Sequence, residues 1–71
     1  MNDKKMNQKL AIDLLYSKHG KLYLDKEATA LELGVGRATI DRMRQTGELK
    51  SSKIKGSVKF ALTEIAKFIQ S

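Results

Sequence analysis

Apolar residues near the start of the chain recur every three to four positions, which is the period of an amphipathic helix. This stripe occupies about residues 7–18 and comprises Leu10, Ala11, Ile12, Leu14, Leu15 and Tyr16. Gly20 follows a basic last turn made of Lys18 and His19, which is typical of a helix end. The pattern therefore predicts an N-terminal helix that stops before Gly20.

A short strand and a short helix are predicted next. The stretch KLYL at residues 21–24 favours β-structure, but it is too brief for more than an edge strand or a single added strand. Asp25 has the side-chain oxygen that caps a helix, and Glu27 places an acid in the first turn. A helix of barely two turns is expected from Lys26 to Leu33.

Two glycines interrupt the helix formers that follow. Gly34 can adopt a left-handed conformation at low steric cost, so it ends the helix and returns Val35 to the core. Gly36 is an acceptable N-cap for a second helix over residues 37–45, which Gly47 ends. Two short helices joined by such a turn form a helix-turn-helix unit, and a plain helical hairpin with a charged outer face is the alternative.

The two faces of the second helix differ in character. Ala30 lies where the two helices approach closely, and Val35, Ile40 and Met43 form the apolar inner face. The outer face consists of Arg37, Ala38, Asp41, Arg42, Arg44 and Gln45. An outer face with arginines near its N-terminal end is suited to the major groove of DNA.

The segment KSSKIKGSVKFAL alternates between apolar and polar residues, which predicts a β-hairpin with one dry side. The predicted faces are Ile54, Val58 and Phe60 on the dry side, and Lys53, Lys55 and Lys59 on the wet side. Ile54 and Val58 share a face only if the loop between them has an odd number of residues. A three-residue turn from Lys55 to Ser57 is therefore expected. The lysines either contact a polyanion or only protect the sheet edges from pairing.

The stretch LTEIAKFIQ predicts a closing helix over residues 62–70, with Thr63 as a candidate cap. Ile65, Phe68 and Ile69 are expected to point inward. Together the elements predict a mainly α fold with a small β-hairpin, which is a winged helix-turn-helix preceded by an N-terminal amphipathic helix.

The length of 71 residues allows one globular unit. Within it we expect an N-terminal helix over residues 1–20, used for packing or self-association, and a winged helix-turn-helix over residues 21–71. A chain this short hides about 60% of the surface that its unfolded form exposes, so an enclosed active site is not expected. The absence of cysteine excludes disulfides and thiolate zinc sites, and fits a reducing cytoplasm.

The remaining composition argues against catalysis and membrane insertion. No apolar run approaches about 18 residues, and the polar N-terminus does not resemble a signal peptide. The carboxylates are scattered and His19 is the only histidine, so the sequence predicts no enzyme, metal site, cofactor or small-molecule ligand. His19 is expected at the surface or near a helix end. The aromatic residues are expected to pack in the core: Tyr16, Tyr23, Phe60 and Phe68.

Charge is concentrated in one part of the chain. The net charge is +6, and residues 34–61 hold seven basic and two acidic side chains, all three arginines included. Such a patch favours a polyanion partner, with duplex nucleic acid first and an acidic membrane surface second. A surface kept soluble by solvated lysines is the alternative.

From Leu24 to Ile69 the sequence resembles the small winged-helix DNA-binding domains of the excisionase group, distant relatives of the MerR N-terminal domain. The resemblance rests on the capped helix DKEATALELGV, the segment RATIDRMRQTGEL before the wing, and Phe60 leading into the last helix. It implies DNA contacts from the recognition helix and the wing: Arg37, Ala38, Thr39, Arg42, Lys53, Lys55 and Lys59. Gly36 replaces the usual hydroxyl-bearing cap of the recognition helix, and the preceding helix is an addition.

Individual roles follow from side-chain chemistry. Arg37 is the best candidate for reading a guanine edge, and Arg42 reads a base or grips a phosphate. Asp41 either accepts from a cytosine amine or pairs with an arginine on its own helix. The remaining candidates set the register through phosphates, with the two hydroxyls as neutral donors: Arg44, Lys50, Lys53, Lys55, Lys59, Thr39 and Ser57.

The sequence therefore predicts specific binding of double-stranded DNA, with helix 37–45 in the major groove and wing 51–61 on phosphates or the minor groove. The expected role is a small transcriptional regulator or an excisionase-like recombination factor, in the cytoplasm of a bacterium or encoded by a phage or mobile element. Homo-oligomers or cooperative assembly on DNA are compatible with it, and a dimer predicts half-sites one helical turn apart. The alternative is a protein-interaction module whose basic face docks on an acidic partner.

Overall fold

The computed structural model describes residues 3–69, with side chains from residue 8 onward. Its elements, in chain order, are α1 (Asp3–His19), β1 (Tyr23–Asp25), α2 (Lys26–Leu33), α3 (Arg37–Thr46), β2 (Ser52–Ile54), β3 (Ser57–Ala61) and α4 (Leu62–Ile69). The predicted mainly helical fold with a β-hairpin is confirmed, and its topology is that of a winged helix-turn-helix. Positions 1, 2, 70 and 71, which belong to the two predicted segments, lie outside the described residues, and Gln70 of the closing helix is among them.

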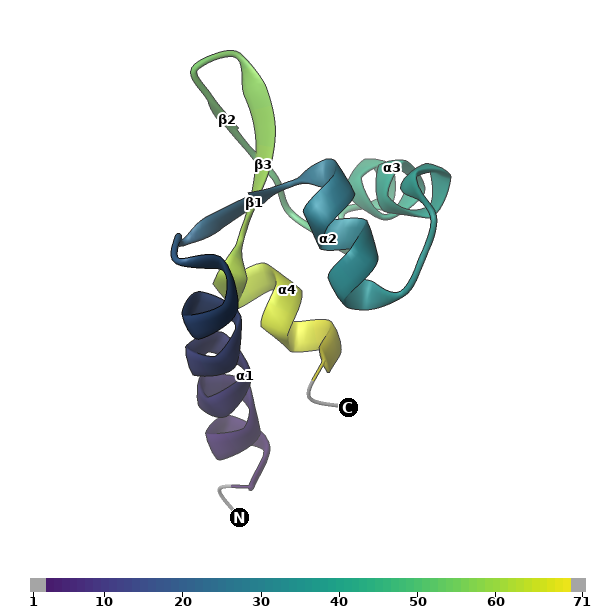
Figure 1. Cartoon of the computed structure of the whole chain (residues 1–71). Helices are drawn as coiled ribbons and strands as arrows, with labels where there is room; N and C mark the ends of the chain where they lie inside the picture. The colour runs from purple at the N-terminus through teal and green to yellow at the C-terminus, as the bar shows by residue number, and fades with distance from the viewer. Residues whose placement is uncertain (1–2, 70–71) are drawn as a thin grey trace.

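The strands form an antiparallel sheet in the order β1-β3-β2, so β1 is an edge strand as predicted. Leu24 of β1 lies directly opposite Phe60 of β3, and both side chains are fully buried. The β2–β3 hairpin extends past the end of β1 and projects from the body of the molecule at the top of Figure 1. The sheet therefore contributes to the core at one end and presents a free hairpin at the other.

Every helix and two of the strands contribute to the core, together with Leu49 from the loop after α3. The buried cluster comprises Leu15, Leu24, Ala30, Ile40, Leu49, Phe60, Leu62 and Ile65. Leu49 was not anticipated from the sequence because no periodic pattern surrounds it. Its N–H donates to the carbonyl of Met43 at 3.1 Å, which turns its side chain inward after α3 ends. Full burial of each large side chain is worth about 1.5–3 kcal/mol.

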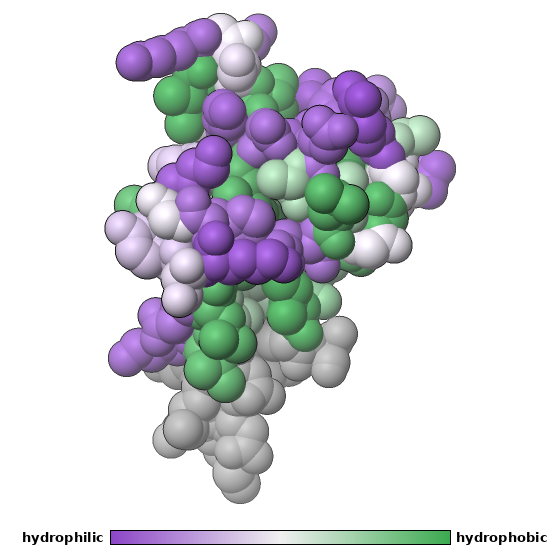
Figure 2. Space-filling view, viewed as in Figure 1, coloured by the Kyte–Doolittle hydropathy of each residue, from purple (hydrophilic) through white to green (hydrophobic). Residues whose placement is uncertain are grey.

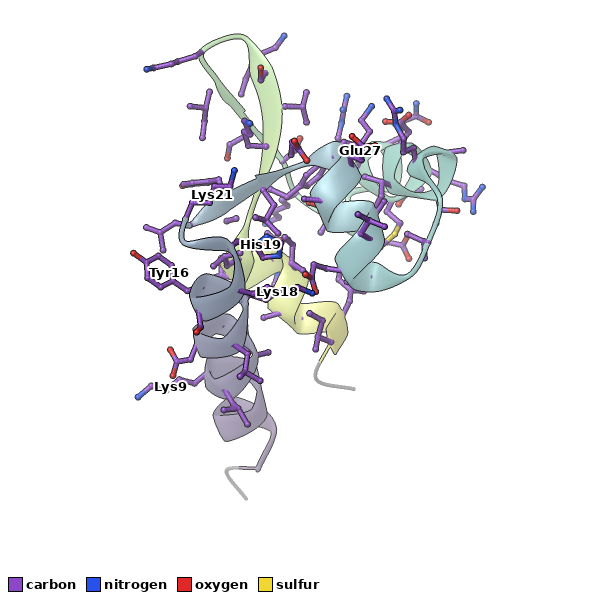
Figure 3. The ribbon with its side chains drawn as sticks, in the orientation of Figure 1. Lys9, Tyr16, Lys18, His19, Lys21 and Glu27 are labelled. Atoms are coloured by element: carbon purple, nitrogen blue, oxygen red, sulfur yellow. The ribbon has the colours of Figure 1, made fainter. Side chains whose placement is uncertain are left out.

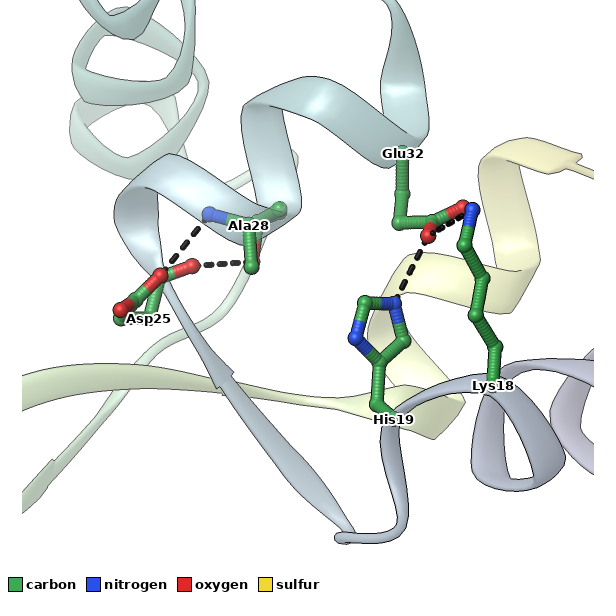
Figure 4. A network of polar contacts seen from close by, with 6 residues as sticks. Lys18, His19, Asp25, Ala28 and Glu32 are labelled. Atoms are coloured by element: carbon green, nitrogen blue, oxygen red, sulfur yellow. Dashed lines mark hydrogen bonds and ion pairs between the residues drawn. The ribbon is translucent and has the colours of Figure 1, made fainter.

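The first turn of α2 is held by Asp25, as predicted. The Asp25 carboxylate accepts a hydrogen bond from the N–H of Ala28 at 2.8 Å (Figure 4). The hydroxyl of Thr29, which is fully buried, donates to the Asp25 carbonyl at 2.7 Å. Because both partners of Asp25 lie in the first turn of α2, the cap fixes the direction in which α2 leaves the sheet.

Helix α1 packs against α4, and Gly20 ends it in a left-handed conformation with φ 71°. Only part of the predicted apolar stripe is buried: Ala11 and Leu15 are buried, whereas Leu10 and Leu14 are exposed. Figure 1 places α1 and α4 together at the lower end of the molecule, away from α3 and the hairpin. The outer side of α1 therefore carries leucines that the core does not need.

Helix α4 begins at Leu62, directly after β3, so the prediction that Thr63 caps it is wrong. The N–H of Leu62 donates to the carbonyl of Leu22 at 2.9 Å, which joins the start of α4 to the residue before β1. Ile65 is buried as predicted, but Phe68 and Ile69 are 36% and 40% exposed. The last turn of α4 extends past the elements that cover its first turns.

Of the aromatic residues predicted to pack in the core, Phe60 alone is buried. Tyr23 alternates with Leu24 along β1, so its side chain lies on the outer face of the sheet. Tyr16 projects from the side of α1 that faces solvent (Figure 3). The prediction is therefore wrong for the tyrosines and for Phe68, because a molecule this small has one core layer and Phe60 fills its centre.

Candidate nucleic-acid interface

Gly34 sets the turn between α2 and α3. Its φ is 70°, and its N–H donates to the carbonyl of Leu31 at 3.3 Å, while the N–H of Val35 donates to Ala30 at 3.0 Å. Residues with a Cβ avoid this left-handed conformation, so glycine ends α2 here as predicted. Ala30 is buried and Val35 is half-buried against the core, which brings α3 close to α2.

Helix α3 is anchored by one side and exposed on the other. It starts at Arg37 as predicted and ends at Thr46, one residue later than expected, before Gly47 at φ 85°. Ile40 is fully buried and Met43 packs partly against the core. Three of the predicted site residues of α3 are exposed: Arg37, Ala38 and Arg42. The other three are half-buried: Thr39, Asp41 and Arg44.

Asp41 is held by an ion pair that the sequence did not reveal. Its Oδ1 lies 2.7 Å from Nζ of Lys26, the first residue of α2, and 4.0 Å from a guanidinium nitrogen of Arg44. The hydrogen-bonded ammonium group of Lys26 holds the pKa of Asp41 below its ordinary value. The expected pairing within α3 is therefore present only as the longer contact with Arg44, and the shorter one joins α3 to α2.

The hairpin has a tighter turn than predicted. Ile54 pairs directly with Ser57, so the loop consists of Lys55 and Gly56 alone, and the three-residue turn is wrong. Both loop residues have positive φ, 52° and 81°. This is the signature of a two-residue type I′ turn, whose twist matches that of the flanking strands.

Because the loop is one residue shorter than predicted, the side chains of β2 lie on the opposite faces of the hairpin from those predicted. Residues directly opposite each other in an antiparallel pair share a face, so Lys53 lies on the same face as Val58, and Ile54 lies on the face of Lys59. Val58 packs against the core, which places Lys53 on the core-facing side of the hairpin. Lys59 lies on the other face, half-buried between Asp25 and Ser52 of the neighbouring strands.

The other predicted contacts lie around the base and the tip of the hairpin. Lys50 is exposed between α3 and β2, and its N–H donates to Oε1 of Glu64 at 3.2 Å, which attaches this segment to α4. Ser57 is exposed beside the turn. Both side chains are accessible to a phosphate backbone at that end of the molecule.

The predicted cations are brought together on one end of the molecule. Figure 1 shows the hairpin at the top and α3 at the upper right, both away from α1, and Figure 2 shows hydrophilic groups at the top and along the upper right of the molecule, with hydrophobic surface between them. Within the described part of the chain, Arg37, Arg42, Lys53 and Lys55 form no ion pair. Their charges are therefore available to an external anion, whereas the acid between the two arginines is already paired.

A second polar cluster joins α1 to α2 on the far side from α3 (Figure 4). Oε2 of Glu32 lies 2.9 Å from Nζ of Lys18 and 2.7 Å from Nε2 of His19. Hydrogen bonds, chiefly from Lys18 and then from His19, outweigh burial and hold the pKa of Glu32 below its ordinary value. His19 is near the end of α1 as predicted, but half-buried, and its role is structural.

No grouping of three or more metal-ligating side chains occurs among the side chains that the structure describes, from residue 8 to residue 69. Among the helices that the structure describes, none combines the length and apolar character needed to cross a membrane.

Comparisons with known proteins agree with this geometry. A family model described as a helix-turn-helix domain matches residues 23–71. An uncharacterized protein of Pasteurella multocida (strain Pm70) is 49% identical over 51 residues, which are 72% of this chain and 77% of that relative. No solved structure matches the chain with significance. The family match starts with β1, so α1 precedes the part of the chain that the family model covers.

Proposed function

Because the chain belongs to the helix-turn-helix domain family, which implies DNA as partner, we propose that it binds double-stranded DNA sequence-specifically. In this proposal α3 enters the major groove, and the hairpin contacts phosphates or the adjacent minor groove. The protein acts by occupying or bending its site, as a small transcriptional regulator or an excisionase-like factor.

The observation that carries the proposal is that Asp41, the acidic residue of α3, is paired with cations of the protein itself. Lys26 and Arg44 neutralise this carboxylate, while Arg37 and Arg42 on the same helix pair with no described acid. This arrangement lowers the repulsion of phosphate and keeps two guanidinium groups available for DNA.

The exposed side chains then divide by role. Arg37, in the first turn of α3, is the base reader, because a guanidinium matches both acceptors of a guanine edge. Arg42 reads a second base or a phosphate from the next turn. The accessible wing and loop residues bind the phosphate backbone, with Lys53 and Lys55 in better positions than the half-buried Lys59.

Lys55 supplies independent support for a wing that binds DNA. Its φ of 52° is a conformation that costs an L-residue about 1–2 kcal/mol, and asparagine is preferred at this turn position. A lysine is therefore a poor choice for the stability of the hairpin. Its charge, at the tip of the hairpin, is well placed for a phosphate.

The test is a titration of labelled duplexes, one of random sequence and one from the genomic neighbourhood of the gene, at low and moderate salt. Arg37→Ala should abolish the preference for the native duplex, a loss of about 1–3 kcal/mol at the base it reads. Lys55→Asn should weaken both duplexes alike and reduce the salt slope by about 1. Asparagine is used because it tolerates the left-handed turn.

Lys21→Ala is the matched control, because it removes one exposed lysine in the turn between α1 and β1, away from α3 (Figure 3). It should change neither affinity nor preference. Equal binding of both duplexes by the wild type, or losses from Lys21→Ala as large as those from Arg37→Ala, would contradict the proposal. The basic face would then serve an acidic protein partner.

A further inference from the structure

The segment between α3 and β2 is fixed at its first end by α3. The N–H of Gly47 donates to the carbonyl of Arg44 at 3.2 Å, and the N–H of Leu49 donates to the carbonyl of Met43 at 3.1 Å. The Leu49 side chain is fully buried in the core, whereas Lys50 is exposed. Helix α3 and the core therefore set the path of the chain as far as Leu49, and Lys50 is the residue at which the chain leaves the core.

Helix α4 holds the same segment at its other end. Oε1 of Glu64 accepts a hydrogen bond from the N–H of Lys50 at 3.2 Å, two residues before β2 begins. Oε2 of the same carboxylate lies 2.8 Å from Nζ of Lys67, and the Glu64 side chain is only 16% exposed. Both oxygens of a largely shielded carboxylate are thus engaged, one by each lysine.

The Glu64 carboxyl group is ionised at neutral pH. Burial acts to raise its pKa, but the hydrogen bonds from Lys67 and from the N–H of Lys50 outweigh burial and hold the pKa of Glu64 below its ordinary value of 4.5. An ionised carboxylate accepts at both of its oxygens, so it can hold the two lysines at the same time.

Both strands of the hairpin are attached to α4. β3 continues directly into α4 at Leu62, so this strand is attached through the chain itself (Figure 1). β2 has no such connection, and the hydrogen bond between Lys50 and Glu64 fastens the residues that lead into it. Because α4 also packs against α2, which packs against α3, this bond relates the base of the hairpin to α3.

We propose that Glu64 is a positioning residue for DNA binding, which holds the Lys50 backbone where the Lys50 ammonium group reaches a phosphate while α3 occupies the major groove. This role rests on the proposed function and adds to it a residue that does not itself touch DNA. The Lys50 ammonium group forms no ion pair with another described side chain, so its charge is available to a phosphate.

Charge alone predicts the opposite effect of removing Glu64. The chain has a net charge of +6, so the loss of one carboxylate should strengthen its attraction to a polyanion. Loss of the hydrogen bond to Lys50 should instead weaken binding, because the segment before β2 is then held at one end only. The sign of the change therefore separates the two effects.

Two substitutions isolate the hydrogen bond. Glu64→Gln and Glu64→Met both remove the negative charge and the ion pair with Lys67, and both introduce an unbranched side chain with good helix propensity. Only glutamine keeps a side-chain oxygen that can accept from the N–H of Lys50. A difference between the two variants therefore reports on this acceptor and not on the charge.

The measurement is a titration of the native and random duplexes over a range of salt concentrations. Glu64→Gln should bind about as tightly as the wild type, because it keeps the acceptor and loses a repulsive charge. Glu64→Met should bind both duplexes about three- to tenfold more weakly than Glu64→Gln at low salt, with a salt slope smaller by about 1, because one phosphate contact is lost. The preference for the native duplex should be the same in both variants, because α3 reads the bases. Equal affinities of the two variants would overturn the proposal.

The same pair of variants in a Lys50→Ala background separates positioning from a general effect on the fold. There Glu64→Gln and Glu64→Met should bind equally, because the ammonium group that Glu64 positions is gone. If Glu64→Met is still the weaker binder in this background, Glu64 acts through the stability of the fold and the proposal is wrong. Amide exchange of Lys50 in the free proteins, followed by NMR, should be faster in Glu64→Met than in Glu64→Gln, and equal rates would show that the hydrogen bond does not form in solution.

Failure of this inference and failure of the proposed function are distinguishable. If the wild type binds neither duplex, or binds both equally, the proposed function fails whatever the Glu64 variants do. If the wild type prefers the native duplex but the two Glu64 variants bind alike, or Lys50→Ala leaves the salt slope unchanged, the positioning role of Glu64 alone fails.

Discussion

Nζ of Lys26 lies 2.7 Å from Oδ1 of Asp41, and this ion pair joins the first residue of α2 to the middle of α3. The contact spans the turn at Gly34 and therefore fixes how the two helices sit against each other. It also removes a free negative charge from the helix that is proposed to face DNA. The same pair thus positions α3 and adjusts its electrostatic field.

Lys26→Met should raise the pKa of Asp41 toward its ordinary value of 3.8, because the hydrogen-bonded ammonium group that lowers it is gone. In the wild type the lowered pKa means that Asp41 stabilises the fold above its unfolded pKa. This contribution is lost as the pH falls through the lowered folded value. Carboxyl NMR titration of both proteins measures the change, and an unchanged Asp41 midpoint would show that the pair does not form in solution.

The same substitution should weaken DNA binding, although Lys26 is not proposed to read a base. Lys26→Met leaves Asp41 with the longer contact to Arg44 alone, so the carboxylate repels phosphate more strongly. The loss should be several-fold at low salt and smaller at high salt because screening reduces charge repulsion. Lys21→Met is the control for the loss of one positive charge, and an equal loss in both variants would argue against a specific role of the pair.

Glu32→Gln should destabilise the protein at neutral pH, because it removes the carboxylate that pairs with Lys18 and His19. The pKa of Glu32 is lowered from 4.5, so its contribution is present above that value and disappears as the pH falls through the folded pKa. Denaturant unfolding from pH 7 to pH 3 should therefore show the two stabilities converging in acid. Glu27→Gln, at an exposed carboxylate, should show a smaller difference, and a gap that stays constant in acid would contradict the assignment.

Gly34 and Gly36 should respond oppositely to substitution. A Cβ at either position meets nothing within 4 Å, so the backbone alone decides. Gly34→Ala should lower the free energy of unfolding by about 1–2 kcal/mol, because φ is 70° there. Gly36→Ser should raise it by a few tenths of a kcal/mol, because serine adds the cap that α3 lacks at φ −82°. Thermal unfolding followed by circular dichroism measures both, and similar losses in the two variants would show that the turn is not set by Gly34.

Lys55→Asn should stabilise the protein while it weakens DNA binding. Asparagine relieves the left-handed strain at φ 52° and should raise the free energy of unfolding by up to about 1 kcal/mol. Its lost charge should lower the affinity for every duplex. Urea unfolding and duplex titration on one preparation separate the effects. A variant that is both less stable and weaker in binding would show that Lys55 acts through the fold of the hairpin.

Local patterns in the sequence were sufficient to predict most of the helices and strands and the residues at which they end. Asp25, Gly34 and Gly47 act within one turn of their own positions, through a cap or a left-handed conformation, so their effects can be predicted without knowledge of the fold. The spacing of apolar residues around Ile40 likewise identified the inner face of α3, because helical periodicity depends only on residues a few positions apart. The clustering of basic residues in one segment likewise indicated the kind of partner.

The hairpin shows where local information ends. The alternation of SSKIKGSVKFA is compatible with a loop of two or of three residues, and a change of one residue moves every side chain of a strand to the other face. In the structure Val58 and Phe60 face the core, and the two-residue turn places Lys53 directly opposite Val58 on that side of the hairpin. Only the tertiary structure could decide this.

The sequence by itself determined the secondary structure, the helix-turn-helix and the location of the positive charge, because each depends on neighbours within a few residues. The tertiary structure decided which half of the α1 stripe is buried, which hairpin face Lys53 occupies and which cation holds Asp41. Lys26 and Asp41 are distant in the sequence and on different helices, so their contact exists only once the turn at Gly34 has closed and Ala30 allows α2 and α3 to approach. Contacts of this kind depend on packing in three dimensions, for which a single sequence contains no periodic pattern.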